Sequence, residues 1–245
     1  ALNWVAGIYA QKRKEDLQRQ HFVAFNSDYE TERYAIYGQI QMALSDTWNV
    51  TAGLRYEHFE DKYNDSNTLI SDSSDNYWSG QFSFEYLLGT HTLIYGTLSR
   101  SVKPGGVNTE TSSSFPVITP SFQPFLLSRQ KFSAETLFNR EVGVKARFLD
   151  NKLTMRLALF HMDRSHAQLE SFVWDANTFI FTGFLDSSSD AENYGAELEI
   201  NYRMGTRADF FANIGLYVIN PKLVKLIPKN KSYDMTEFIQ LIKKK

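Results

Sequence analysis

The chain has 245 residues, of which 42% are hydrophobic and 15% aromatic, and its formal net charge is −2. This aromatic content excludes an intrinsically disordered chain, and the near-neutral charge gives no indication of nucleic-acid binding. The lack of cysteine excludes a disulfide framework, a thiolate metal site and a cysteine nucleophile. No apolar run approaches the roughly 18 residues of a membrane-spanning helix, which excludes a helical membrane protein but not every membrane protein.

Apolar and polar residues alternate with a period of two along most of the chain, as in strands with two different faces. The alternation is clearest in residues 48–59 and 193–204. It predicts nine strands, at residues 2–16, 32–44, 48–61, 75–87, 91–103, 133–148, 152–165, 191–203 and 207–218. Most of these segments are longer than a typical strand of five or six residues and suit a tilted crossing of a bilayer.

The connections between these segments alternate strictly between short and long. Short turns are predicted at residues 45–47, 89–90, 149–151 and 205–206, and long connections at 17–31, 62–74, 104–132 and 166–190. Outer-membrane barrels have this asymmetry, with tight periplasmic turns and long outer loops. The sequence therefore predicts an all-β fold, an antiparallel outer-membrane β-barrel fragment of about nine strands.

The two faces of the predicted strands support this interpretation. If the apolar face contacts lipid, the other face lines a wet lumen, where Lys145, Glu197 and Glu199 stay charged. A soluble barrel would bury such charges at several kcal/mol each unless they were paired. Aromatic residues near strand ends, such as Trp48 and Trp78, are then interfacial girdle residues.

The C-terminal segment has a different composition. Residues 219–245 contain seven lysines and two acidic residues, whereas residues 1–218 contain 19 basic and 26 acidic side chains. Asp234 and Glu237 form a capping-box-like start for an amphipathic helix. The predicted domains are therefore a partial barrel at 1–215 and a lysine-rich tail with a short α-helix at 216–245.

Several motifs resemble the barrel of TonB-dependent outer-membrane receptors. Residues 94–108 read Ile-Tyr-Gly-Thr-Leu-Ser-Arg-Ser-Val-Lys-Pro-Gly-Gly-Val-Asn, like a barrel strand of that family entering a Gly-Gly loop. Residues 48–57, 135–145, 157–163 and 193–199 continue the resemblance in the family's order, over about residues 1–214. The resemblance implies a receptor in the outer membrane of a Gram-negative bacterium. It also implies uptake of a scarce ligand, most often a ferric siderophore, driven through TonB.

The chain also departs from that family. No segment resembles the N-terminal plug or its TonB-contacting box, and the family's barrels resemble the plugged 22-stranded class. We therefore expect an internal portion of a receptor, with TonB acting through a plug that this chain lacks. The tail, about residues 216–245, resembles a stretch of sugar-phosphate nucleotidyltransferases, which suggests a fused or mis-joined frame. A diverged receptor tail is the alternative.

No catalytic residue or cofactor is predicted. The five histidines share no metal-ligand spacing, so no metal site is predicted, and a polar lumen explains Glu197 and Glu199 without catalysis. Aromatic and cationic residues of the long outer loops suit a flat, anionic iron chelate through stacking and charge, although packing between the loops explains them equally well. The candidates are Lys103, Phe115, Phe122, Phe125, Arg129, Phe172, Trp174 and Phe179.

These residues leave other function classes open. A passive porin or a surface adhesin would use the same barrel pattern, and the tail alone suggests a nucleotidyltransferase fragment. The expected partners are outer-membrane lipid, a ferric siderophore or similar small ligand, and TonB, with no nucleic acid.

Overall fold

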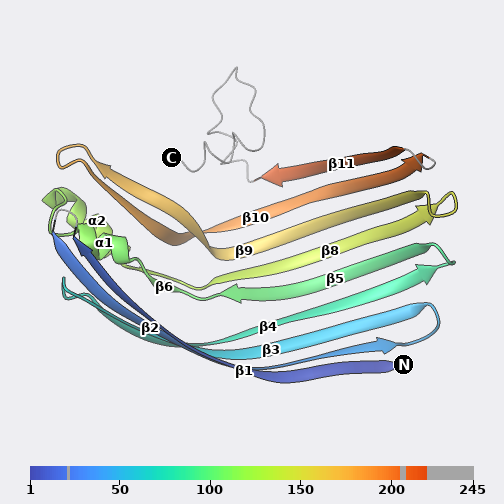
Figure 1. Ribbon diagram of the computed structural model, residues 1–245, viewed down its shortest axis with the longest axis horizontal. Coiled ribbons are helices and arrows are strands. Elements are labelled where there is room, and N and C mark those ends of the chain that lie inside the picture. Colours follow the sequence, from blue (N-terminus) through green and yellow to red (C-terminus); the bar gives the residue numbers. More distant parts are fainter. Residues whose placement is uncertain (21–22, 205–207, 220–245) are drawn as a thin grey trace, which may run out of the picture.

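The computed structural model describes residues 1–20, 23–204 and 208–219. Nine of its strands form one antiparallel sheet in which chain order is kept, β1-β2-β3-β4-β5-β8-β9-β10-β11 (Figure 1). Their bounds are β1 Leu2–Gln20, β2 Ala24–Ala43, β3 Trp48–Asp65, β4 Ile70–Leu88, β5 Thr92–Lys103, β8 Glu135–Phe148, β9 Leu153–Asp175, β10 Ile180–Met204 and β11 Ala208–Ile219. The predicted all-β fold of nine antiparallel strands is confirmed.

The segment between β5 and β8 leaves the sheet. It contains a two-stranded ribbon, β6 and β7, and three short helical elements between the two ribbon strands. The bounds are β6 Gly106–Val107, α1 Thr109–Ser114, η1 Pro120–Phe122, α2 Gln123–Leu127 and β7 Lys131–Phe132. We call residues 104–134 the inner segment. No helix among the described residues is long and apolar enough to cross a membrane.

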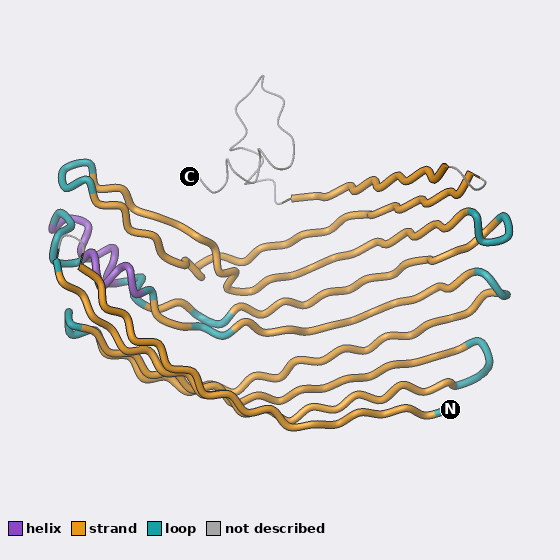
Figure 2. Tube along the Cα trace, in the orientation of Figure 1, coloured by secondary structure: helices purple, strands orange, loops and turns teal. Residues whose placement is uncertain are grey.

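The two ends of the sheet differ as the connection lengths predict. The short turns at 44–47, 89–91 and 149–152 lie at one end, together with the N-terminus, and the inner segment lies at the other, outer end (Figure 2). Three of the four predicted long connections are wrong in their secondary structure, because residues 17–31, 62–74 and 166–190 mostly extend the hairpins. Beyond the lipid a strand contacts water on both faces. These extensions therefore lack the alternation of apolar and polar residues that would have predicted them as strands.

The register places apolar residues on one continuous face. Exposed Leu159 and Leu216 belong to a row of paired residues that crosses all nine strands. The row consists of Leu2, Met42, Val50, Phe84, Gly96, Val142, Leu159, Ala196 and Leu216. Half-exposed apolar side chains in an unbroken band are typical of a surface that contacts lipid. We call this the outward face.

The opposite, inward face carries the charged residues that the alternation predicts for a lumen. Arg156 Nη1 lies 3.1 Å from both carboxylate oxygens of Glu199. The Lys145 ammonium lies 4.8 Å from the ring centre of Tyr95, whose hydroxyl donates to Glu141 at 2.6 Å. These charged groups of the inward face therefore contact polar or aromatic neighbours while they remain open to water.

The larger buried apolar side chains are concentrated at the outer end. Ile118 and Leu126 of the inner segment are almost fully buried, as are Phe59, Ile180 and Phe184 of the sheet. Phe125 packs edge-on against Phe184, with ring centres 5.7 Å apart. The inner segment thus supplies the local core of the outer end.

Strand β10 contains an irregularity between its outer part, residues 180–186, and its membrane part, residues 191–204. Its pairing with β9 shifts register between Asp186 and Ser189, and again between Ser189 and Ala191. Such bulges bend a strand and increase its local twist. The outer part of the β9–β10 hairpin therefore bends away from the line of its membrane part, as Figure 1 shows.

The predicted boundary between residues 215 and 216 falls within β11, which pairs with β10 as far as Ile219. Residues 220–245, including the predicted helix, lie outside the described residues. A separate origin for the tail stays a prediction.

The substitution Ile40→Arg tests the assignment of the outward and inward faces. Ile40 lies on the outward face and is 50% exposed, whereas the neighbouring Gln41 lies on the inward face. In a receptor containing this chain, Ile40→Arg is expected to lower the folding free energy in lipid vesicles by about 2 kcal/mol, because a charge would face hydrocarbon. Gln41→Arg is the matched control and should change it by less than about 0.5 kcal/mol. Denaturant titration measures both, and equal effects would contradict the assignment.

Candidate functional site

The inner segment is fastened to the sheet at its base by Gln168. The side-chain amide of this buried residue donates to the carbonyl of Pro104 at 2.8 Å and to that of Ser133 at 3.0 Å. Its backbone N–H donates to Glu135 at 2.8 Å, and Arg164 Nε donates to the other oxygen of that carboxylate at 2.7 Å. Both ends of the inner segment are therefore held by one side chain of β9.

A second attachment is made by Asn108, which is buried beside β10. Its side chain accepts from the backbone N–H of Leu185 and donates to the carbonyl of the same residue, both at 2.8 Å, as a neighbouring strand would. The same amide nitrogen donates to the carbonyl of Arg129 at 2.8 Å. Asn108 thereby joins the start of α1, the end of the inner segment and β10.

The tip of the β9–β10 hairpin provides a third attachment through Asp175. The backbone N–H of Thr119 donates to its carboxylate at 2.7 Å, as does the Thr178 hydroxyl, and the N–H of Asn177 donates at 3.0 Å. Burial acts to raise the pKa of Asp175, but these hydrogen bonds favour the carboxylate and lower the pKa well below its ordinary value. The carboxylate stays charged and holds the inner segment against the hairpin.

A cavity of about 230 Å³ lies between the ribbon and the inward face of β1 to β3. Three cationic side chains, Arg13, Arg33 and Lys103, line it with the single acidic residue Glu15. Its other lining residues are Tyr29, Thr31, Phe59, Pro104, Gly105, Phe132, Gln168 and Leu185. We call it the cationic cavity.

The walls of the cationic cavity carry stacking and hydrogen-bonding groups. The Arg33 guanidinium lies 5.0 Å from the ring centre of Phe59. Gln168 Oε1 is buried and has no hydrogen-bond partner among the described residues. At Gly105 an added Cβ would lie 2.5 Å from the carbonyl oxygen of Phe132, so only glycine fits where the ribbon strands approach. The cationic and aromatic walls can therefore take an anion with a planar part.

A second cavity of about 610 Å³ adjoins the first, since Phe132 and Leu185 line both. It has a more aromatic wall and two acidic residues, Glu110 and Glu170. Its aromatic residues are Phe132, Phe172, Phe181 and Phe184. We call it the aromatic cavity.

The predicted ligand-binding residues do not form one site. Lys103 lines the cationic cavity and Phe172 the aromatic cavity, where its ring stacks on Phe181 with 5.0 Å between centres. Phe179 lines a third cavity, of about 230 Å³, beside Arg19. Trp174 packs edge-on against Phe179, 6.2 Å between ring centres, and is 49% exposed at the hairpin tip.

The other candidates take part in packing within the outer end. Arg129 lies over the Phe125 ring at 3.8 Å from its centre and 3.5 Å from Asp186. Burial acts to raise the pKa of Asp186, but hydrogen bonds from Ser188 and the charge of Arg129 lower it. Phe115 and Phe122 are partly buried and line neither the cationic nor the aromatic cavity.

The sequence did not identify Arg13, Arg33 and Phe59 as site residues. Arg13 and Phe59 lie in predicted strands, and Arg33 near the start of another. Arg33 pairs with Phe59 across β2 and β3, so their alternation with outward residues is the signal that they share the inward face. Only the fold of the inner segment over that face turns them into cavity walls.

Three possible metal ligands, His161, Asp163 and Glu192, also meet on the outward face, where the sequence predicted no metal site. Glu192 is brought to the other two by the pairing of β9 with β10, which spacing along the chain does not reveal.

Residues 3–234 match the profile of a protein family described as TonB dependent receptor-like, beta-barrel. The fold also resembles solved receptor structures at low sequence identity. The ferric yersiniabactin uptake receptor FyuA of Yersinia pestis is 22% identical with a TM-score of 0.62, and the match covers 89% of this chain and 33% of FyuA.

Two further structures support the same fold. The copper transporter OprC is 15% identical with a TM-score of 0.68, and the match covers 88% of this chain and 35% of OprC. BauA, the ferric preacinetobactin receptor of Acinetobacter baumannii, is 13% identical with a TM-score of 0.55, and the match covers 88% of this chain and 33% of BauA. The chain thus spans about a third of the length of these proteins. All three are named as transporters or receptors, in agreement with the prediction that the chain is not an enzyme.

Asp175→Asn tests the attachment of the inner segment. The substitution should speed amide hydrogen exchange around Thr119, because the neutral amide is a weaker acceptor. The native pKa is lowered, so the carboxylate stabilises the attachment above the ordinary Asp pKa of about 3.9 and loses this effect as the pH falls through the lowered value. The difference from the native protein should therefore persist from pH 7 to about 4 and vanish in stronger acid.

Asp150→Asn, in a short turn at the opposite end of the sheet, is the control for this measurement. Equal exchange in the native protein and Asp175→Asn at pH 7 would contradict the role of the carboxylate.

Proposed function

Because this chain belongs to the TonB-dependent receptor β-barrel family, we propose that it forms part of an outer-membrane receptor that takes up an anionic iron chelate of the siderophore class. The observation that carries the choice of ligand is the cationic cavity at the outer end of the inward face. Similarity to two ferric-siderophore receptors also supports it, although a copper transporter shares the fold.

The charge balance of the cationic cavity favours an anion. Arg13 contacts Glu15, and Arg33 lies 4.0 Å from Glu57, so part of their charge is neutralised by neighbours. Lys103 makes no ion pair within the described part of the chain, which leaves its ammonium for a ligand. A charged hydrogen bond of this kind contributes about 1.5–3 kcal/mol.

The aromatic side chains would receive the planar part of a chelate. Phe59 and Phe132 line the cationic cavity, and Phe132 also borders the aromatic cavity, so one ligand can extend from one into the other. The side chain of Gln168 also lines the cationic cavity. A ligand held there would also contact the residue that fastens the inner segment.

Uptake against a gradient requires energy, which in this proposal comes through TonB and a plug. The chain offers no motif that matches a plug, so no residue is assigned to the TonB contact. The outward face contacts outer-membrane lipid of a Gram-negative bacterium.

Alanine variants of a receptor containing this chain test the ligand site. Lys103→Ala and Arg33→Ala are expected to weaken binding of a ferric siderophore by about tenfold or more each, since each removes a charged contact of about 1.5–3 kcal/mol. Titration of ligand-dependent tryptophan fluorescence in detergent micelles measures the affinity. Added salt should reduce the difference between native protein and variants.

The matched control is Arg147→Ala, an exposed cation near a short turn at the opposite end of the sheet. Arg129→Ala and Trp174→Ala distinguish the cationic cavity from the hairpin tip. If these two weaken binding while Lys103→Ala and Arg33→Ala do not, the ligand binds elsewhere on the outer end.

A further inference from the structure

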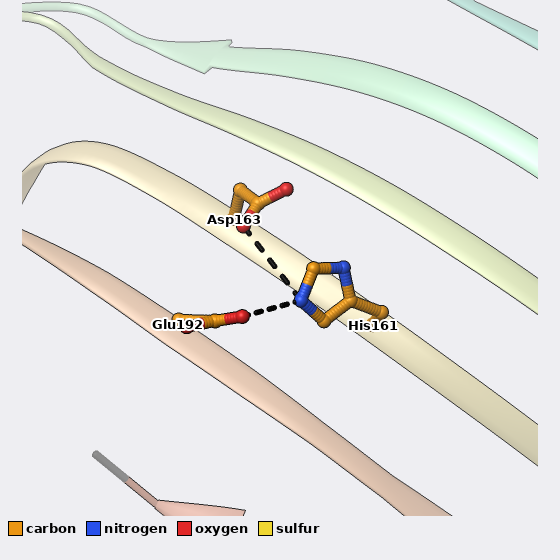
Figure 3. A group of neighbouring side chains, drawn as sticks. All are labelled: His161, Asp163 and Glu192. Atoms are coloured by element: carbon orange, nitrogen blue, oxygen red, sulfur yellow. Dashed lines mark hydrogen bonds and ion pairs between the residues drawn. The ribbon is translucent and has the colours of Figure 1, made fainter.

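The outward face carries a polar group that ligand uptake does not explain. His161 and Asp163 of β9 and Glu192 of β10 point toward one another (Figure 3). His161 Nε2 lies 2.6 Å from Glu192 Oε1 and 3.8 Å from Asp163 Oδ1. One ligand atom from each residue lies within 4.8 Å of the other two.

The sheet itself brings these side chains together. His161 and Asp163 are two residues apart on one strand and so share a face, and Asp163 pairs directly with Glu192 on the next strand. Two like charges directly opposite each other destabilise a sheet unless a cation lies between them. A positive charge beside this pair of carboxylates would therefore stabilise the sheet.

Arg140 of β8 supplies one positive charge, which neutralises only one of the two carboxylates. Its Nη1 donates to Asp163 Oδ2 at 2.6 Å and lies 2.8 Å from His161 Nδ1. Since a guanidinium can only donate, Nδ1 is the acceptor and the imidazole hydrogen is on Nε2, where it donates to Glu192. With a neutral imidazole the four side chains carry a net charge of −1. Asp163 Oδ1 still faces the imidazole.

The group lies at the outer border of the apolar band. His161 is two residues beyond Leu159, which belongs to the apolar row, and it pairs with the aromatic Tyr194 on β10. The side chains of His161, Asp163 and Glu192 are 37%, 43% and 54% exposed. An ion can therefore reach them from the lipid headgroup layer, whose phosphates attract divalent cations.

We propose that His161 Nε2, Asp163 Oδ1 and one carboxylate oxygen of Glu192 bind a divalent transition-metal ion on the lipid-facing wall of the receptor. One imidazole nitrogen and two carboxylate oxygens suit Zn²⁺, which takes four ligands in protein sites. The fourth position faces the headgroup layer and is filled by water or a phosphate oxygen. When the ion binds Nε2, the imidazole hydrogen shifts from Nε2 to Nδ1, so the imidazole stays neutral. The guanidinium of Arg140 then moves away from Nδ1 and keeps its bond to Asp163 Oδ2.

Zn²⁺ titration by calorimetry tests the site in a detergent-solubilised receptor containing this chain, freed of metal with a chelator. His161→Gln and Glu192→Gln should each weaken the tightest Zn²⁺ binding by more than about tenfold. Arg140→Gln should strengthen it several-fold, because it removes a competing cation. The side chains of His161, Glu192 and Arg140 are partly or fully exposed, so each variant should fold, and a circular dichroism spectrum like that of the native protein would verify this.

His58→Gln is the matched control, because His58 is an outward-facing, partly exposed histidine bonded to Asn76 rather than to a carboxylate. It should leave Zn²⁺ affinity within twofold of native. Unchanged affinity in His161→Gln and Glu192→Gln, or an equal loss in His58→Gln, would overturn the proposal. The titration uses no siderophore, so its outcome is independent of the proposed uptake function.

Discussion

Within a lipid bilayer every backbone N–H and C=O group needs a protein partner, because no water is available there. The antiparallel pairing from β1 to β11 satisfies this requirement for the strands between the two edges of the sheet, and the other features of the chain depend on it. Fixing the pairs fixes the two faces, since successive residues alternate between them. The same register places Arg33 opposite Phe59 on the inward face and Asp163 opposite Glu192 on the outward face.

The fold could be predicted from the sequence where one face of a strand contacts lipid. There the period of two is sharp, and the nine strands and three of the predicted short turns follow from it, whereas the predicted turn at 205–206 lies outside the described residues. Beyond the lipid the contrast disappears, so the outer parts of β1 to β4 and of the β9–β10 hairpin were predicted as loops. The candidate site was only partly predictable: Lys103 and Phe172 border cavities, but Arg13, Arg33 and Phe59 become cavity walls only when the inner segment folds over them.

At the outer end, a few side chains fix the path of the inner segment, and other residues line the two cavities. The inner segment has little regular structure, and three side chains hold it: Gln168 at its base, Asn108 beside β10 and Asp175 at the hairpin tip. Each accepts from or donates to backbone groups, so substitutions in the segment at positions other than Asn108 leave these bonds in place. The lining of both cavities can therefore vary while the path of the chain is kept. The proposed ligand site and the proposed metal site lie on opposite faces of this wall and share no residue.

The irregular pairing of β10 between Asp186 and Ala191 has a consequence for how such a receptor can evolve. In a regular hairpin, inserting one residue would reverse the faces of everything beyond it, and a charge would then face lipid. Here the interruption separates the ladder of the membrane wall from that of the outer hairpin. Insertions or deletions beyond it would alter the length and direction of the hairpin without disturbing the pairing of His161 with Tyr194 or of Leu159 with Ala196. The outer hairpin can thus change in length and direction while the membrane wall stays unchanged.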